Sequence, residues 1–179
     1  MQVPAGGSSP SGASPHGAAL PYQAVLFDMD GVVTQTAAVH AAAWKQLFDS
    51  VLQDPRLAGR PRRDPFDEDA DYRRYVDGRQ REDGVTAFLA SRDASLPAGG
   101  PDDGPDAWSV HGLGARKNAL FLEAVTRDGI RAYPGTTGLL ARLRAAGIPV
   151  GLVTASRNAR ALLTAAGLDA GFDVIIDGQ

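Results

Sequence analysis

The sequence predicts an α/β fold in which a parallel sheet is interrupted by an inserted, mostly helical domain. Three apolar segments, at 23–28, 148–154 and 173–177, have the composition of strands and alternate with helical stretches, as expected of a parallel sheet. The connection between the first two strands is too long for a simple crossover, and structureless loops of that length are rare in compact domains. We therefore expect a second, helical domain from about residue 36 to 130.

Composition narrows the class of protein. The chain has 179 residues, 44% of them hydrophobic, and a formal net charge of -3, which suits one globular domain with an insertion. Its basic residues are scattered, so we expect no nucleic-acid partner. The absence of cysteine excludes disulfides and thiolate metal sites. No apolar run is long enough to span a membrane and no secretory signal is visible, so the expectation is a cytoplasmic enzyme with no membrane partner.

The N-terminal segment 1–20 contains no charged side chain and consists largely of Gly, Ser, Pro and Ala. Such a segment cannot bury enough apolar surface to offset its chain entropy, so we predict a disordered tail in which His16 is inert. The pattern changes at Tyr22. "YQAVLF" is continuously apolar, which favours a short strand covered on both faces of a sheet.

A helix is predicted after Thr36, because apolar and aromatic residues recur on one face at helical spacing: His40, Trp44, Leu47 and Val51. Two short helices are expected between 66 and 92, with Gly78 and Gly84 at turns, followed by a loop, "DASLPAGGPDDGPDAW". Three later helices are each expected to end at a glycine: 113–128 before Gly129, 136–146 before Gly147 and 157–166 before Gly167.

Paired carboxylates follow the first strand in "AVLFDMDGVV". Asp28 and Asp30 are two residues apart, so the alternation of side chains can direct both into one crevice beyond the carboxyl end of the sheet. There they can hold a hard cation, or one can act as a nucleophile while the other transfers protons. The alternative is that both simply terminate a strand and cap a turn, with Gly31 allowing the bend.

A second polar segment, "VTASRN", ends the next strand and begins a helix. The side chains of Thr154, Ser156 and Asn158, together with free backbone N–H groups, can face an anion there. Ser156 as an ordinary helix cap is the alternative. Taken together, the two strand ends indicate metal-assisted phosphoryl transfer, with a carboxylate nucleophile, magnesium, and donors around the phosphate.

These motifs resemble those of a known superfamily. "FDMDGVVTQT" resembles the first motif of the haloacid-dehalogenase superfamily, and "VTASRN" resembles its second. Within that superfamily the chain looks like the β-phosphoglucomutase family from about residue 22 onward, including "DGVVTQTAAVHAAAWK", "GRQRED" and "ARKNALF". The resemblance implies a Rossmann-like core formed by 21–35 and 131–179, with a helical cap at 36–130.

The resemblance also implies roles for the carboxylates. Asp28 would be phosphorylated, and Asp30 would act as general acid and base toward a sugar hydroxyl. Mg²⁺ would contact the Asp28 carboxylate and the Asp30 main-chain carbonyl. The reaction implied is interconversion of β-glucose 1-phosphate and glucose 6-phosphate through a bisphosphate. The open alternatives are a sugar-phosphate phosphatase on the same fold, and a non-catalytic phosphosugar-binding module or inactive fragment.

The substrate-binding residues are implied in the same way. In the core, phosphate would be held by Thr154, Ala155, Ser156 and Asn158, with Arg157 nearby. In the cap, Arg81 and Lys117 would bind the other phosphate end of the sugar, and His40 would couple cap closure to Asp30, with Trp44 on the same helix face. Without the motifs, His40 would be interpreted as a packed core histidine, and Arg81 and Lys117 as solvated helix charges.

Two departures from the family pattern stand out. Gln35 occupies a position that is usually acidic. The superfamily's third motif, a lysine, and its fourth, an acidic pair, do not follow "DVIIDGQ". The expectation is therefore an incomplete portion of an enzyme that is a monomer when complete and whose partner is a small-molecule sugar phosphate.

Overall fold

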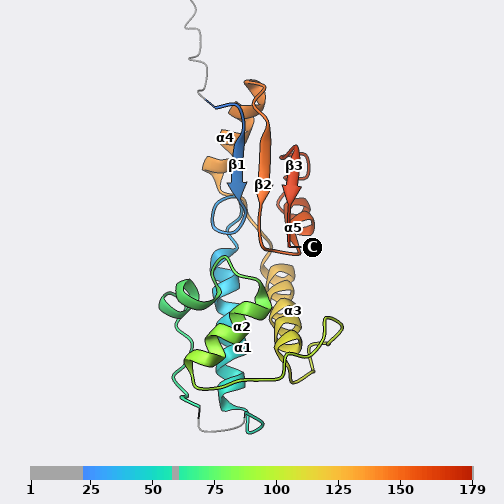
Figure 1. The fold of residues 1–179 in the computed structure, drawn as a ribbon. Coiled ribbons are helices and arrows are strands. Elements are labelled where there is room, and N and C mark those ends of the chain that lie inside the picture. Colours follow the sequence, from blue (N-terminus) through green and yellow to red (C-terminus); the bar gives the residue numbers. More distant parts are fainter. Residues whose placement is uncertain (1–21, 58–60, 179) are drawn as a thin grey trace, which may run out of the picture.

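The computed structural model describes residues 22–57 and 61–178. A small sheet with two helices forms one body, and a cluster of helices forms the other, as Figure 1 shows. The predicted tail at 1–20, with His16, lies outside the described residues. The helices from α1 to α3 fall within the predicted insertion at 36–130.

The sheet consists of three parallel strands in the order β1-β2-β3, with β1 at Val25–Asp28, β2 at Val150–Val153 and β3 at Val174–Ile176. The register aligns Phe27 with Leu152, and Leu152 with Ile175. The three predicted strands are confirmed, each slightly shorter than its apolar segment.

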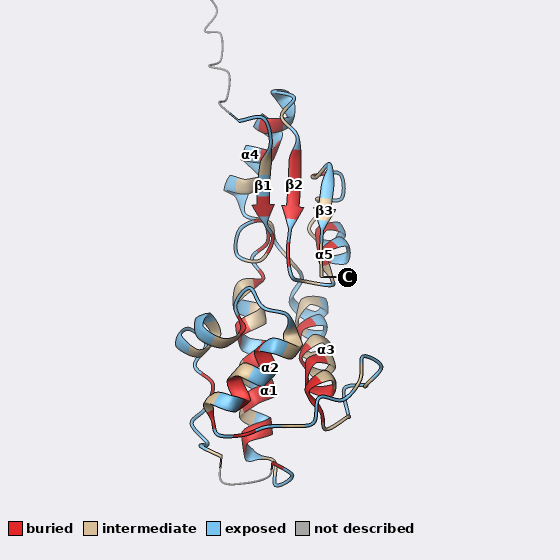
Figure 2. Ribbon diagram, viewed as in Figure 1, coloured by how far each residue is buried: buried red, intermediate tan, exposed pale blue. Residues whose placement is uncertain are grey.

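Only one face of this sheet is covered by described residues. Helices α4 (Pro134–Ala145) and α5 (Ala159–Ala165) pack their leucines against the face that carries Phe27 and Leu152. On the opposite face Leu26 is 70% exposed and Val174 is 55% exposed. Figure 2 shows β3 largely in the pale blue of exposed residues. The prediction that β1 is covered on both faces is therefore wrong for the described chain, because both helices pack on the same side.

The helical body is built from α1 (Ala37–Gln53), a π-helix η1 (Tyr72–Val76), α2 (Arg81–Ser91) and α3 (Val110–Asp128). Its core is aromatic: Phe48 stacks on Trp44 and on Phe88, with ring centroids 5.0 and 3.9 Å apart. Helices α1 and α3 continue toward the sheet, where Phe121 joins the core beneath it. Their shared packing connects the cap to the sheet domain.

Helix boundaries follow local chemistry. Helix α3 begins at Val110, three residues before the prediction, because the Ser109 hydroxyl accepts a hydrogen bond from Gly112 N–H at 3.0 Å and caps the first turn. Gly78 occupies a turn with φ +66°, as predicted. Gly84 does not, because it lies inside α2, where a Cβ atom would approach Val76 Cγ1 to 3.1 Å. It is a packing glycine that lets α2 lie close to its neighbours.

Candidate active site

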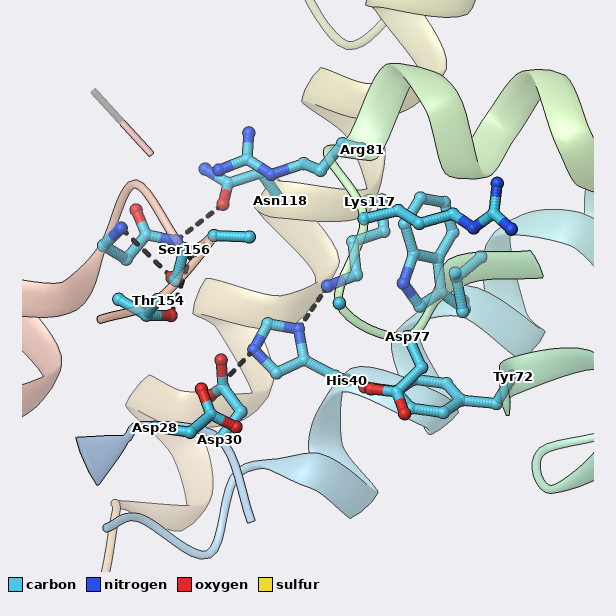
Figure 3. Close-up of a pocket in the computed structure, with 16 residues that line it drawn as sticks. Asp28, Asp30, His40, Tyr72, Asp77, Arg81, Lys117, Asn118, Thr154 and Ser156 are labelled. Atoms are coloured by element: carbon cyan, nitrogen blue, oxygen red, sulfur yellow. Dashed lines mark hydrogen bonds and ion pairs between the residues drawn. The ribbon is translucent and has the colours of Figure 1, made fainter. Parts of the chain in front are cut away.

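A pocket opens at the carboxyl ends of β1 and β2, between the sheet and the cap, as shown in Figure 3. Its walls come from both bodies. The lining residues are Asp28, Asp30, His40, Trp44, Tyr72, Val76, Asp77, Gly78, Arg79, Arg81, Lys117, Asn118, Thr154, Ala155, Ser156 and Asn158.

The carboxylate loop follows the expected alternation. Met29 is fully buried under the loop, whereas Asp28 and Asp30 on either side of it line the pocket. The amides of Val33 and Thr34 both donate to Met29 O at 2.9 Å, and Gly31 turns the chain with φ +81°. This tight loop fixes both carboxylates at the strand end, which is the common location for ligands in parallel sheets.

The two carboxyl groups have opposite pKa shifts. Burial raises the pKa of Asp28. The Met29 N–H, which donates to Asp28 Oδ1 at 2.8 Å, acts in the opposite direction, and the negative charges of Asp30 and Asp77 add smaller increases. Burial also opposes ionisation of Asp30, but the contacts with His40 and the Thr36 hydroxyl lower its pKa overall. Asp30 is thus held as a carboxylate. Carboxyl groups with separated pKa values can take different roles in one reaction.

His40 connects Asp30 to the cap. Its Nε2 atom lies 3.3 Å from Asp30 Oδ1, and its Nδ1 atom contacts Lys117 Nζ. The imidazole also stacks on Phe121 with centroids 3.9 Å apart, so it is a packed histidine as well as a polar bridge. Burial lowers the pKa of His40, and the nearby Lys117 charge adds to this effect. The neutral imidazole is the form that this environment favours.

Lys117 is a buried cation, not a solvated helix charge. Only 3% of it is exposed, and its ammonium lies 5.1 Å from the Trp44 ring centroid and 5.0 Å from that of Phe121. Burial lowers the pKa of Lys117 to about 7, and the Arg81 charge acts in the same direction. A site that keeps a lysine buried and partly unprotonated is a functional candidate, because such an arrangement is costly to maintain.

The second strand end forms a chain of polar contacts. Ser156 N–H donates to Thr154 Oγ1 at 3.1 Å, and Asn158 N–H donates to Ser156 Oγ at 3.2 Å. Asn158 Nδ2 in turn donates to Asn118 Oδ1 of α3 at 2.7 Å, which joins the sheet loop to a cap helix. Ser156 is not the helix cap, since α5 begins at Ala159 with Asn158 as its N-cap residue.

Arg81 begins α2 and is half-buried at the pocket wall, on the side that faces Ser156 in Figure 3. Burial and the positive charge of Arg157 both lower the pKa of Arg81. Arg157 does not line the pocket, and its Nε donates to Gly178 O at 3.2 Å. Two guanidinium groups therefore lie near the same end of the pocket, which favours an anion there.

The structure brings together every predicted site residue except Arg157. The roles assigned to these residues stay predictions. Sequence reasoning missed Tyr72, Asp77, Arg79 and Asn118. Asn118 directly follows Lys117 in "ARKNALF", and Asp77 and Arg79 flank Gly78, so neighbouring positions in recognised motifs were the available signal.

The residues present fit a magnesium ion. Mg²⁺ is usually held by one or two carboxylates together with waters and substrate phosphate, so a complete protein cage is not required. Among residues 22–57 and 61–178, no group of three or more acidic or histidine side chains could hold a metal. The Asp28 carboxylate nevertheless keeps one oxygen free, and no described donor bonds to the Asp30 main-chain carbonyl. These oxygens are available hard ligands.

Comparison with known families places the chain in a family of hydrolases. Residues 22–179 match the hydrolase family described as haloacid dehalogenase-like hydrolase, and the chain belongs to that family. It is 43% identical over 156 residues to the beta-phosphoglucomutase of Mycobacterium bovis, covering 87% of this chain and 60% of the relative. Beta-phosphoglucomutase of Bacillus subtilis is 29% identical over 158 residues, again with 87% and 60% covered. The chain thus spans about three fifths of the length of these relatives.

Solved structures show the same fold. A beta-phosphoglucomutase from Clostridium difficile matches with a TM-score of 0.61 and 23% identity, covering 87% of this chain and 61% of that one. CbbY from Rhodobacter sphaeroides in complex with phosphate matches with a TM-score of 0.62 and 23% identity, covering 87% and 63%. In the part of the chain that the structure describes, no helix is both long and apolar enough to cross a membrane.

Proposed function

We propose that this protein catalyses Mg²⁺-dependent phosphoryl transfer on a sugar phosphate, interconverting β-glucose 1-phosphate and glucose 6-phosphate through a phosphorylated Asp28. One observation carries the proposal: a single pocket is lined by the carboxylates Asp28 and Asp30 and by the basic side chains of Arg81 and Lys117. Identity to beta-phosphoglucomutases supports the choice of substrate.

The chemistry assigned to Asp28 is nucleophilic. A carboxylate oxygen would bond to the phosphorus atom of the substrate while the bond from phosphorus to the sugar oxygen breaks. The loop built on Met29 O holds Asp28 at a fixed position, which limits the entropy lost on reaching the transition state. Its partly exposed carboxylate is accessible to the substrate.

We assign proton transfer to Asp30. Its lowered pKa keeps it ionised, so it can accept the proton of a sugar hydroxyl as that oxygen attacks the phosphoryl group on Asp28. In the reverse step it returns the proton to the leaving oxygen. The contact with His40 makes the ionisation of Asp30 depend on the position of α1, which also belongs to the cap.

Magnesium would be held by the Asp28 carboxylate and the Asp30 main-chain carbonyl, where it would neutralise negative charge on the transferring group. The side chains of Thr154, Ser156 and Asn158 would orient phosphate oxygens beside it. Arg81 would hold the distal phosphate of the substrate, because a planar guanidinium can donate two parallel hydrogen bonds to one phosphate group.

A phosphatase acting on the same class of substrate is the second candidate. Asp28 is exposed, so water can reach a phosphoryl group carried there, and the family is one of hydrolases. A mutase must exclude that water during transfer. The ratio of glucose 6-phosphate to free inorganic phosphate formed from β-glucose 1-phosphate distinguishes the two activities.

The test is turnover of β-glucose 1-phosphate with millimolar Mg²⁺ in the parent protein and in Asp28→Asn. We expect the substitution to leave less than about a hundredth of the activity, since loss of a nucleophile costs several powers of ten. Asp83→Asn makes the same charge change on α2 outside the pocket and should leave activity unchanged. Substantial turnover in Asp28→Asn would show that the chemistry lies elsewhere. Tight phosphosugar binding without turnover in the parent protein would favour a binding module.

A further inference from the structure

Tyr72 and Asp77 form a wall of the pocket that the proposed chemistry does not use. Both residues come from the cap, and Figure 3 shows their side chains next to each other on the side of the pocket away from Ser156. Among the described residues neither the Tyr72 hydroxyl nor the Asp77 carboxylate has a hydrogen-bond partner. The pocket therefore presents one neutral donor and one charged acceptor that are both free to bind a ligand.

The π-helix explains how two residues five positions apart come to share this wall. Asp77 N–H donates to Tyr72 O at 2.9 Å, which closes the wide turn of η1. In an α-helix, residues five apart differ in direction by about 140°, so they would not share a face. π-Turns are uncommon and frequently occur at functional sites. The irregular turn thus places a phenol and a carboxylate together at the pocket.

Charge divides the pocket into two ends. Arg81 and the Ser156 loop line the side of the pocket away from Tyr72 and Asp77, and their cationic and polar side chains favour the phosphates of a ligand. Asp77 lies on the other side of the pocket, close enough to Asp28 for its negative charge to contribute to the raised pKa of Asp28. Burial and the nearby carboxylates raise the pKa of Tyr72, so its hydroxyl stays protonated and can donate. A carboxylate group of a ligand placed beside Tyr72 and Asp77 would be repelled, whereas a hydroxyl group could donate to Asp77. The phosphoryl group transferred to Asp28 is a separate case, because Mg²⁺ would neutralise its charge.

We propose that Tyr72 and Asp77 form a hydroxyl-binding subsite that recognises the sugar body of the substrate and rejects phosphorylated carboxylic acids. The inference rests on the proposed sugar-phosphate function and adds a reason why the protein would prefer sugar phosphates over other phosphate esters. Asp77 would accept hydrogen bonds from sugar hydroxyls, and Tyr72 would donate to a sugar oxygen. A substrate with a carboxylate in this position would meet a like charge, which is an effective means of excluding a competitor.

Calorimetric binding of three ligands tests the subsite: glucose 6-phosphate, phosphoglycolate, which has a carboxylate and no hydroxyl, and inorganic phosphate. In Asp77→Asn we expect affinity for glucose 6-phosphate to fall about tenfold, because a hydrogen bond to a charged acceptor is lost. Affinity for phosphoglycolate should rise severalfold as the repulsion is removed, and affinity for inorganic phosphate should stay within about twofold. Asp83→Asn is the matched control and should bind all three ligands like the parent.

Tyr72→Phe separates hydrogen bonding from charge. It removes only the hydroxyl group while keeping the ring that packs on the cap core. We expect weaker binding of glucose 6-phosphate, by about threefold to tenfold, with no gain for phosphoglycolate. If Asp77→Asn strengthened binding of all three anions equally, Asp77 would act as a general charge and the subsite would be refuted.

Failure of the inference can be distinguished from failure of the proposed function. If the parent protein prefers glucose 6-phosphate over inorganic phosphate and both variants keep that preference, the sugar-phosphate function stands and the subsite is overturned. If the parent protein binds glucose 6-phosphate no better than inorganic phosphate, both are overturned. Loss of the preference in both variants, with gain of phosphoglycolate binding only in Asp77→Asn, supports both.

Discussion

Replacement of Lys117 by methionine should remove a pH dependence of stability between pH 7 and 9. The folded protein holds the pKa of Lys117 at about 7, whereas an unfolded chain would return it to its ordinary value near 10.5. Between these values the unfolded state binds the extra proton, so the free energy of unfolding rises with pH. The destabilisation is complete below the folded pKa and disappears above the unfolded one. From pH 7 to 9 this single group contributes a rise of about 2 kcal/mol.

The assay is urea unfolding of the parent protein and Lys117→Met at pH 7, 8 and 9, followed by circular dichroism. The parent should gain stability across this range and the variant should not. Lys45→Met is the control. Lys45 lies on the surface beside Asp49, and this carboxylate raises the pKa of Lys45, so Lys45 does not titrate between pH 7 and 9. An equal pH slope in the parent and Lys117→Met would refute the argument that burial lowers the pKa of Lys117.

Three further substitutions test separate parts of the structure. Arg81→Ala should reduce conversion of β-glucose 1-phosphate about a hundredfold, because this substrate needs a distal anion site. Hydrolysis of a small phosphate ester, which does not need that site, should fall only a few-fold. Equal losses on both substrates would show that Arg81 does not bind the distal phosphate. Gly84→Leu should lower the free energy of unfolding by about 1–3 kcal/mol in urea titration, because its Cβ position is already close to Val76, and an unchanged midpoint would contradict this packing. Leu26 belongs to an exposed apolar face of the sheet, so Leu26→Thr should change the free energy of unfolding by less than about 0.5 kcal/mol. The same substitution should reduce self-association measured by light scattering. A large loss of stability would mean that this face is covered.

The fold was largely predictable from the pattern of apolar residues and from the glycines that mark helix ends and turns. Three apolar segments became three parallel strands, and Gly129, Gly147 and Gly167 each follow a helix with positive φ. Gly84 was misassigned because a glycine needed for close packing in a helix has the same sequence appearance as one in a turn. An apolar segment does not reveal which helices cover it, so the sequence alone could not specify that the face of β1 carrying Leu26 is the exposed one.

The candidate site was predictable where residue order alone determines position. Asp28 and Asp30 flank one buried residue at a strand end, so alternation placed both in the pocket. The contact between His40 and Lys117 was not predicted, because it depends on how α1 packs against α3. The recognised motifs pointed to each residue separately, His40 beside Asp30 and Lys117 at a phosphate. Tyr72 and Asp77 could not be predicted, because their approach depends on a π-turn that has no periodic signature.

The central claim is that Asp28 carries the phosphoryl group, and the most direct test is to detect the group there. The protein is incubated with Mg²⁺ and β-glucose 1,6-bisphosphate, quenched in acid, digested, and its peptides are examined by mass spectrometry beside Asp28→Asn. We predict one added phosphoryl group on the peptide containing Asp28 in the parent protein and none in the variant. A phosphoryl group on another residue, or equal labelling of both proteins, would contradict the account.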